Sequence, residues 1–469
     1  MRASTCTEEN SMKEFENIII GFGKGGKTIA GALAAKGEST AIIEKSNKMY
    51  GGTCINVACI PTKSLEHSAR LSFAQGGDFA AKTERYRNAV EEKRRLTTML
   101  RGKNYDKAVA AGALVIDGEA SFTGKNTIEV KSADGSVEAY KAKRIFINTG
   151  SVPFIPPIEG LTESKHVFMS ETMMENEVLP KELVIIGGGY IGLEFASYYT
   201  NFGSHVTIIQ DGDAFIPRED SEVADAVFAN LTSRGITIIK NAQVKSVHDE
   251  DDNAVVTVED AVNHTTQILK ADAVLVATGR RPNIASLNLS AGGIEVTERG
   301  AIKVDEKLRT TADNVWAMGD VAGGLQFTYI SLDDSRIVKS QLVGDGSRTT
   351  QNRGTVPYSV FIDPPLSRAG LTEAEARAKG YDVKVAKLPA AAIPKAQVLQ
   401  KPAGLLKAVI DAKTNEILGA HLFCADSHEM INVVKIAMDA HVPYTVLRDS
   451  IFTHPTMSES LNDLFSAVK

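Results

Sequence analysis

Residues 15–37 read FENIIIGFGKGGKTIAGALAAKG, an apolar run followed by a glycine-rich turn and an alanine-rich stretch. This order predicts a buried strand, a tight turn and a helix. Gly21, Gly23 and Gly26 have the spacing GxGxxG, and Glu44 ends the next apolar run. Such glycines permit the turn, the approach of a pyrophosphate and the packing of helix on strand, while the acidic residue binds ribose hydroxyls. We therefore expect a dinucleotide here, with its phosphates at the start of the helix.

The same order returns later in the chain, in the stretch ELVIIGGGYIGLEFASYYTNFG at 182–203. Gly187, Gly189 and Gly192 repeat the glycine spacing, and the next apolar run ends at Gln210. An acidic residue at that position usually binds the 2′-hydroxyl of NAD. The neutral Gln210 is compatible with NADH or NADPH, and the lack of a close arginine for a 2′-phosphate favours NADH.

Each of these two units closes with a similar strand and glycine turn. IFINTGS at 145–151 closes the first unit, and VLVATGRRPN at 274–283 closes the second. The sequence therefore predicts an α/β fold in which two tandem Rossmann-like dinucleotide-binding domains precede an α+β C-terminal domain. The expected boundaries are 1–12 for a disordered tail, 13–152 for the first dinucleotide-binding domain, 153–281 for the second, 282–350 for a return segment completing the first, and 351–469 for the C-terminal domain.

The charged residues exclude one class of partner. The net charge of -6 argues against a nucleic-acid partner, because phosphate binding requires a basic surface. A charged stretch from about Ser64 to Ala111 predicts helix, and its run EEKRR at 91–95 is interpreted as a solvated helix face.

The termini and cysteines indicate a cytoplasmic protein. No apolar run reaches the roughly 20 residues that span a bilayer, and the N-terminal MRASTCTEENSM has no apolar signal core. The chain has four cysteines, at positions 6, 54, 59 and 424, which is too few for a secreted disulfide framework.

Two of the cysteines lie close together in GGTCINVACIPTKSL, residues 51–65. Pro61 suits the first turn of a helix that begins near Cys59, where backbone N–H groups stabilise a thiolate. Cys54 can meet Cys59 across the short loop, and Lys63 lies one turn further along the same helix face. A zinc site needs about four ligands, and no second cysteine pair supplies them. We therefore interpret the pair as a redox dithiol rather than as a metal site or two structural thiols.

The motifs GGTCINVACIPTK, GGGYIGLE, ATGRRPN, MGD and HPTMSE together resemble those of the class I pyridine nucleotide–disulfide oxidoreductases. The resemblance extends from about Phe15 to Lys469. It implies FAD at the first fingerprint, NADH or NADPH at the second, and a homodimer formed through the C-terminal domain. One departure is Ala58, which stands where the family usually has glycine, and alanine would be strained there if the loop required a positive φ.

The resemblance also implies roles for individual residues. Cys59 would face the flavin, and Cys54 would be the interchange thiol that meets the substrate. Lys63 and Glu194 would pair near the flavin. The acid–base pair reaching the dithiol of the other subunit would be His454 and Glu459. The cofactor contacts implied by the motifs are Gly52, Thr53, Lys63, Thr149, Gly150, Tyr190, Ile191, Gly279 and Asp320, besides the residues of the two fingerprints.

Four further segments resemble one branch of the family, the reactive-chlorine-resistance flavoproteins with their hypothiocyanous acid reductase relatives. These segments are GFGKGGKT, GGLQFTYISLDD, PYSVFIDPPLSRAGLTE and IFTHPTMSESLNDLF. The resemblance implies a small oxidant such as hypothiocyanous acid as substrate. The alternatives are dihydrolipoamide or another small disulfide, and copper(II) reduction; a non-enzymatic copper- or redox-binding protein is the alternative of another class. No resident metal is expected, and His421, Cys424 and His428 are interpreted as ordinary residues of the C-terminal domain.

Overall fold

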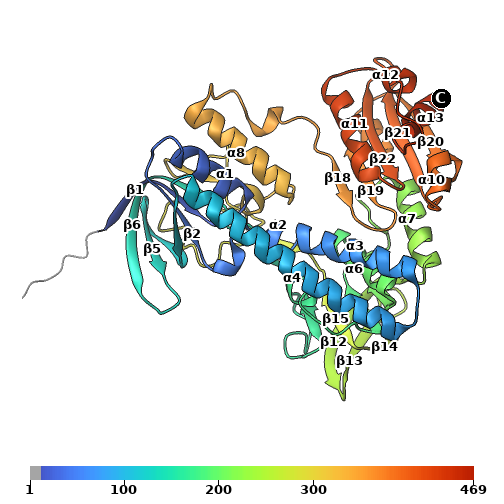
Figure 1. Ribbon diagram of the computed structural model, residues 1–469, viewed down its shortest axis with the longest axis horizontal. Coiled ribbons are helices and arrows are strands. Elements are labelled where there is room, and N and C mark those ends of the chain that lie inside the picture. The colour runs from blue at the N-terminus through green and yellow to red at the C-terminus, as the bar shows by residue number, and fades with distance from the viewer. Residues whose placement is uncertain (1–11) are drawn as a thin grey trace, which may run out of the picture. The chain divides into compact units, whose positions relative to one another are not determined.

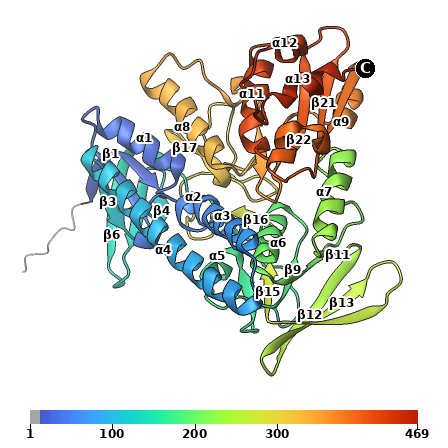
Figure 2. The same cartoon turned by 45° about the vertical axis from the view of Figure 1, so that its right-hand side comes forward.

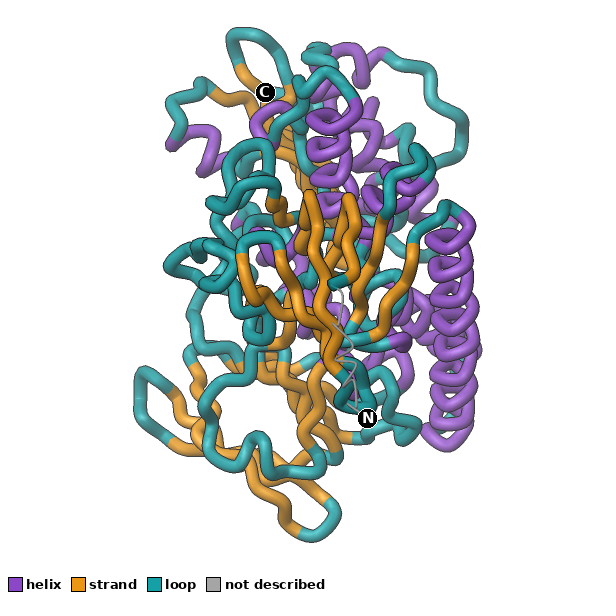
Figure 3. Tube along the Cα trace, turned by 90° about the vertical axis from the view of Figure 1, so that its left-hand side faces the viewer, coloured by secondary structure: helices purple, strands orange, loops and turns teal. Residues whose placement is uncertain are grey.

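The computed structural model describes residues 12–469, so Cys6 and nearly all of the expected N-terminal tail lie outside the described residues. The chain forms two compact units. The first contains the chain up to Pro61 together with Arg94–Pro153 and Arg280–Arg353, and the second contains Thr62–Lys93, Phe154–Gly279 and Gly354–Lys469. Both units contain helices and strands (Figure 3).

The first unit is built on a sheet of order β3-β2-β1-β6-β5-β4, with β17 pairing with β6. Strands β1, β2, β3, β6 and β17 pair in parallel, whereas β4 and β5 continue the sheet in antiparallel pairing. The strand bounds are β1 Lys13–Ile20, β2 Thr40–Glu44, β3 Leu114–Asp117, β4 Glu119–Gly124, β5 Thr127–Lys131, β6 Val137–Ile147 and β17 Val315–Ala317.

Both faces of strand β1 are covered, because its apolar residues alternate between two cores. Ile18 and Ile20 belong to one cluster, and Ile19 belongs to the other. Helices α1 (Lys24–Ala34) and α8 (Thr328–Val343) cover the Ile19 face, where they lie side by side (Figure 1). The glycine turn between β1 and α1 is therefore fixed by burial on both sides.

The charged stretch predicted as one helical region from 64 to 111 is two helices, α3 (Cys59–Gln75) and α4 (Phe79–Ala110). They are separated at Gly76 and Gly77, which both have a positive φ. The interpretation of EEKRR as a solvated face is wrong at Lys93, whose side chain is buried and pairs with Glu175. A lysine in a charged run is buried here because a distant segment of the same chain supplies the carboxylate of Glu175.

The second unit contains a parallel sheet of order β11-β10-β9-β15-β8. Its strands are β8 Val167–Met169, β9 Glu182–Ile186, β10 His205–Ile209, β11 Thr237–Ile239 and β15 Ala273–Val276, and its helices are α5 Ser170–Met173, α6 Tyr190–Phe202 and α7 Ser221–Ser233. An antiparallel three-stranded sheet follows, formed by β12 Ala242–Glu250, β13 Asn253–Asp260 and β14 Thr266–Ala271 (Figure 2). In the first unit, β7 (Ser151–Pro153) pairs with β16 (Arg280–Pro282).

The C-terminal part has an antiparallel sheet of order β18-β19-β22-β21-β20. Its strands are β18 Tyr358–Val360, β19 Leu366–Gly370, β20 Val383–Pro389, β21 Leu405–Asp411 and β22 Ile417–Phe423, and its helices are α9 Glu373–Ala378, α10 Pro394–Val398, α11 Ser427–Asp439, α12 Tyr444–Asp449 and α13 Ser460–Ser466. The predicted fold class is thereby confirmed, while the predicted domain boundaries stay predictions. Within residues 12–469, no helix is long and apolar enough to cross a membrane.

Candidate active site

The first fingerprint is packed tightly by the protein itself. Gly21 has a φ of +99°, and a Cβ atom on Gly26 would lie 2.7 Å from the Gly21 carbonyl oxygen. A Cβ atom on Gly23 would lie 2.5 Å from Oδ1 of Asn148. That oxygen accepts a hydrogen bond from the Gly26 N–H at 2.8 Å, so it has little freedom to move. Side chains are thus excluded from all three glycine positions by the surrounding chain.

Glu44 stands at the end of β2 and faces this turn. Its Oε2 accepts from the Phe22 N–H at 3.0 Å, and its Oε1 accepts from the Ser46 N–H at 3.2 Å. Burial raises the pKa of Glu44, and the backbone hydrogen bonds oppose that rise. The carboxylate is therefore fixed in orientation at the position where a ribose would bind.

Asp320 follows β17 in the short 3-10 helix Gly319–Ala322. Its Oδ2 accepts a hydrogen bond from the Ser151 hydroxyl at 2.7 Å, and that hydroxyl in turn accepts from Arg280 Nε at 2.9 Å. Burial raises the pKa of Asp320. A buried carboxylate with further acceptor capacity fits a polyhydroxyl chain such as that of FAD.

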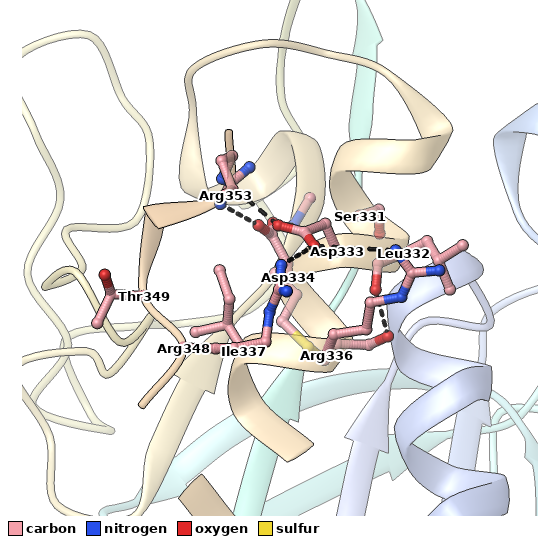
Figure 4. A network of polar contacts seen from close by, with 12 residues as sticks. Ser331, Leu332, Asp333, Asp334, Arg336, Ile337, Arg348, Thr349 and Arg353 are labelled. Atoms are coloured by element: carbon pink, nitrogen blue, oxygen red, sulfur yellow. Dashed lines mark hydrogen bonds and ion pairs between the residues drawn. The ribbon is translucent and has the colours of Figure 1, made fainter. Parts of the chain in front are cut away.

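Two neighbouring aspartates on α8, Asp333 and Asp334, lie against the guanidinium groups of Arg348 and Arg353 (Figure 4), and Asp334 also supports the turn that carries Asp320. The buried Asp334 accepts from the Gly319 N–H at 2.7 Å and from Arg353 at 2.8 Å, while Asp333 accepts from Arg348 at 2.6 Å. Burial also raises the pKa of Asp334. Sequence reasoning missed this support, because nothing in the spacing of these residues indicates that they meet.

Gly52 and Thr53 bring the cysteine loop against the fingerprint. Gly52 has a φ of +82°, and a Cβ atom on it would lie 2.6 Å from the Cα atom of Gly23. Thr53 begins the short helix α2 (Thr53–Asn56), and its hydroxyl would lie 3.7 Å from a Cβ atom on Gly150. Thr149 is held by a 2.7 Å hydrogen bond to the Asn283 carbonyl. The residues expected to surround FAD in this unit therefore fit such a group.

The two loop cysteines, Cys54 and Cys59, are both partly buried. Cys59 is the first residue of α3, as predicted, and its sulfur lies 3.4 Å from the hydroxyl of Thr328 at the start of α8. A hydrogen bond with Cys59, burial and the charge of Cys59 raise the pKa of Cys54. The reduced pair therefore resists carrying two negative charges. Ala58 is not among the positive-φ residues of the described chain, so alanine is accommodated there.

Lys27 lies beneath the cysteine loop and was missed by sequence reasoning. Its ammonium donates to the Gly51 carbonyl at 3.2 Å and to Oδ1 of Asn104 at 2.6 Å. Burial lowers the pKa of Lys27 to about 8, an effect that the charge of Cys54 opposes. The first fingerprint helix thus carries a positive charge toward the loop that holds the dithiol.

The second fingerprint has a different surface. A Cβ atom on Gly192 would lie 2.2 Å from the Gly187 carbonyl oxygen, but one on Gly189 would meet no atom within 4 Å. Gln210 is buried, and its amide donates to the carbonyl oxygens of Gly212 at 2.8 Å and Ala214 at 2.9 Å. The Gln210 side chain therefore stabilises the turn that follows it, at residues 211–214. Tyr190 and Ile191 open α6, and Gly279, with a φ of +109°, would have no atom near an added Cβ.

Lys63 and Glu194 are brought together in the second unit. The ammonium of Lys63 donates to both carboxylate oxygens, at 2.8 and 2.7 Å, and lies 4.4 Å from the ring centroid of Phe361. The Phe361 N–H also donates to Glu194 at 2.9 Å. The predicted pair is present, and the C-terminal part holds it in place.

His454 and Glu459 lie together in the C-terminal part. Nδ1 of His454 is 2.8 Å from Oε2 of Glu459, and the histidine side chain is 73% exposed. By contrast, His421 is buried with its Nε2 bonded to the Leu371 carbonyl at 3.1 Å, and Cys424 is buried against Met430. An exposed histidine with a carboxylate behind it can exchange protons with a neighbouring molecule.

Residues 15–335 match the family model described as pyridine nucleotide-disulphide oxidoreductase, and residues 356–465 match the dimerisation domain of the same family. The chain belongs to the pyridine nucleotide-disulphide oxidoreductase family. It is 50% identical to the probable pyridine nucleotide-disulfide oxidoreductase RclA of Escherichia coli K12, over 98% of this chain and 100% of that protein. It is 34% identical to a dihydrolipoyl dehydrogenase of Mycobacterium tuberculosis H37Rv, over 97% of this chain and 98% of the relative. A mercuric reductase of Bacillus cereus is 33% identical, over 98% of this chain and 72% of the relative.

Solved structures agree with this assignment. The HOCl-induced flavoprotein disulfide reductase RclA from Escherichia coli superimposes with a TM-score of 0.90 at 49% identity, covering 97% of this chain and 100% of that one. A Cu(II) complex of that protein matches with a TM-score of 0.90 at 50% identity, over 97% of this chain and 100% of that chain. As a member of the pyridine nucleotide-disulphide oxidoreductase family, the chain is a flavoprotein disulfide reductase that uses FAD and a reduced nicotinamide dinucleotide. Its dimerisation domain supports a homodimer.

Proposed function

We propose that the chain is a cytoplasmic enzyme that uses NADH, or NADPH, to reduce a small electrophilic oxidant, with hypothiocyanous acid as the preferred substrate. The observation that carries the proposal is the pair of thiols at the start of α3, where Cys59 lies beside Thr328 and where the interaction with Cys59 raises the pKa of Cys54. The full-length similarity to an HOCl-induced reductase favours an oxidant over a metabolic disulfide. Bound FAD would pass the two electrons of a hydride to the cysteine disulfide.

In the proposed cycle, the reduced pair carries one proton and one negative charge. Cys54 attacks the sulfur of hypothiocyanous acid, an S–S bond forms, and the S–O bond breaks with release of water once the Cys54 proton reaches the oxygen. Cys59 then attacks the Cys54 sulfur and displaces thiocyanate, which restores the disulfide. The balance is one NADH and one hypothiocyanous acid giving NAD⁺, thiocyanate and water.

A proton must travel from Cys54 to the departing oxygen, and His454 is proposed to carry it. The imidazole is exposed and oriented by Glu459, which suits a proton shuttle. We propose that it serves the dithiol of the partner subunit, so that each active site of the homodimer contains residues of both chains.

Copper(II) is a second candidate substrate, because a related structure is a Cu(II) complex. Within the described part of the chain, no group of three or more histidine, cysteine, aspartate or glutamate side chains forms a metal site. Copper(II) would therefore be met as an electron acceptor at the dithiol, each ion taking one electron.

The test is steady-state oxidation of NADH and NADPH with hypothiocyanous acid, lipoamide, oxidised glutathione and copper(II) measured side by side. Hypothiocyanous acid is expected to give the highest kcat/KM, and oxidised glutathione a low one. Cys54→Ser should abolish turnover while the flavin remains reducible by NADH. Cys424→Ser, at a buried cysteine of the C-terminal part, is the matched control and should retain turnover. Faster turnover with lipoamide would assign a disulfide substrate, and turnover by Cys54→Ser would overturn the dithiol mechanism.

A further inference from the structure

We propose that Glu219 is a positioning residue for the nicotinamide nucleotide, acting by holding the side chain of Tyr190 at the start of α6. The inference rests on the proposed assignment of the second fingerprint to that nucleotide. Neither the fingerprint spacing nor the family motifs include Glu219, which lies between β10 and α7 immediately before Asp220, the N-cap of α7.

The start of α6 is the open part of the second fingerprint. Gly189 is the N-cap residue of α6, and an added Cβ atom there would meet no atom within 4 Å. Tyr190 is the first residue of the helix and stands next to this space. Because a pyrophosphate binds at such a helix start, the direction of the Tyr190 side chain decides whether the space stays free for the nucleotide.

Tyr190 is directed by a buried carboxylate. Its hydroxyl donates to Oε1 of Glu219, and the hydroxyl of Tyr358 donates to the same oxygen at 2.6 Å. The two rings lie 5.8 Å apart, centroid to centroid. Burial, together with the charge of Glu219, raises the pKa of both tyrosines. Both phenols therefore remain protonated donors throughout the working pH range.

The carboxylate of Glu219 is itself buried and fixed by its neighbours. Its residue is 6% exposed, and among the described residues its Oε2 has no hydrogen-bond partner. The guanidinium of Arg368 contacts the Tyr358 hydroxyl at 3.5 Å and also donates to the Arg218 carbonyl oxygen. A buried carboxylate is tolerated when donors and a nearby cation stabilise it. Its two phenol contacts are thus the main interactions that its oxygens make.

The C-terminal part reinforces the arrangement along one face of α6. Positions 190, 194 and 197 lie on that face, since they are spaced by four and three residues. Each contacts the segment 358–363. The contacts are Tyr190 with Tyr358 at 3.4 Å, Glu194 with the Phe361 N–H at 2.9 Å and Ser197 with the Asp363 N–H at 3.1 Å. The helix is therefore fixed by these contacts, and loss of the Glu219 carboxylate would release the hydroxyls of Tyr190 and Tyr358 without releasing the helix.

The expected consequence is a change in nucleotide affinity without a change in chemistry. In Glu219→Ala the Tyr190 ring loses its anchor and samples the space beside Gly189. The Kd for NADH should rise about tenfold, the effect of losing one hydrogen bond to a charged group. The limiting rate of flavin reduction and the turnover number at saturating NADH should change less than twofold.

The experiment is anaerobic stopped-flow reduction of the FAD-loaded protein at a series of NADH concentrations. Tyr190→Phe should raise the Kd to the same extent as Glu219→Ala, Tyr358→Phe should raise it less, and Glu219→Gln, which keeps an acceptor oxygen, should lie between wild type and Glu219→Ala. Glu298→Gln and Tyr381→Phe, both at exposed positions, are the matched controls and should match wild type.

Unchanged Kd values in Glu219→Gln and Tyr190→Phe would overturn the inference, and these two variants decide the matter if Glu219→Ala does not fold. A fall in the limiting rate with an unchanged Kd would also overturn it. If NADH reduces the wild-type flavin in a saturable way in the same experiment, the proposed nucleotide site stands even when the inference about Glu219 fails. If the wild type shows no saturable reduction by NADH or NADPH, the proposed function fails instead.

Discussion

The two glycine fingerprints share one spacing but use their middle glycine differently. At Gly23 a side chain would collide with Asn148 at 2.5 Å, whereas at Gly189 it would meet no atom within 4 Å. Gly23 is therefore required by the packing of the protein itself. Gly189 is required only by the ligand that binds beside it. A sequence pattern that looks like one motif thus reports two different constraints.

The two fingerprints also differ in the residue at the end of the next strand and in the residue four positions after the middle glycine. Glu44 accepts hydrogen bonds from two backbone N–H groups, whereas Gln210 donates two to carbonyl oxygens of its own turn. Four positions after the middle glycine, the first helix has the half-buried Lys27 and the second has the buried Leu193. The first site contains charged groups placed against its loop, while the second is neutral at both positions.

The largest expected effect is the difference between alanine substitutions at the two middle glycines, Gly23 and Gly189. Gly23→Ala should lose FAD and destabilise the protein by about 3 kcal/mol, because the new methyl group overpacks a pinned Asn148. Gly189→Ala should keep its FAD and its stability to within about 0.5 kcal/mol, yet raise the Kd for NADH roughly tenfold or more. Flavin content, melting temperature and NADH titration check both variants. Equal loss of stability in the two would contradict the comparison.

The next effect concerns the end of β10. Gln210→Glu is expected to destabilise the protein by roughly 2 kcal/mol, because a buried carboxylate would face the Gly212 and Ala214 carbonyl oxygens without donating to them. Urea unfolding followed by circular dichroism measures the loss. Gln243→Glu, at an exposed position, is the control and should be nearly neutral. A stable Gln210→Glu variant that simply gains NADH preference would refute this account of the turn.

Lys27 provides a pH-dependent test. Its folded pKa of about 8 lies below its ordinary value of 10.5, so the folded state releases the proton first as the pH rises. Burial of the charged ammonium lowers the free energy of unfolding, and this effect is largest at neutral pH, where the lysine is protonated. As the pH rises from 8 to 10.5 the folded state loses the proton, and the free energy of unfolding increases. Relative to Lys27→Met, wild type should therefore gain about 2 kcal/mol between pH 7 and 10. If the difference in unfolding free energy between wild type and Lys27→Met is the same at pH 7 and pH 10, the ammonium of Lys27 is not buried.

The smallest expected effect is at Glu44. Glu44→Gln leaves one of the Phe22 and Ser46 N–H groups without its acceptor, at a cost of about 1 kcal/mol. FAD should bind about fivefold more weakly, which titration of the apoprotein with FAD measures. Glu129→Gln, on the exposed side of β5, should bind FAD like wild type. An unchanged affinity in Glu44→Gln would mean that this carboxylate does not orient the ribose site.

Much of the fold follows from local pattern. The turn after β1 and the start of α3 at Cys59 could both be predicted, because each depends on a few adjacent residues with restricted backbone preferences. The pairings of Asp334 with Gly319, of Lys93 with Glu175 and of Glu219 with Tyr190 could not. Each joins residues that are distant in the sequence and carry no distinctive spacing.

By itself, the sequence determined the two nucleotide-binding units, the close pair of cysteines at the start of a helix and the family, because glycine and cysteine spacings encode backbone geometry directly. Only the tertiary structure decided which glycine is constrained by the protein and which leaves space for a ligand. It also decided that Gln210 serves its own turn, that Lys27 lies under the dithiol loop and that Glu219 directs Tyr190. Burial, hydrogen-bond partners and pKa shifts depend on which distant segments meet, and that information exists only once the chain has folded.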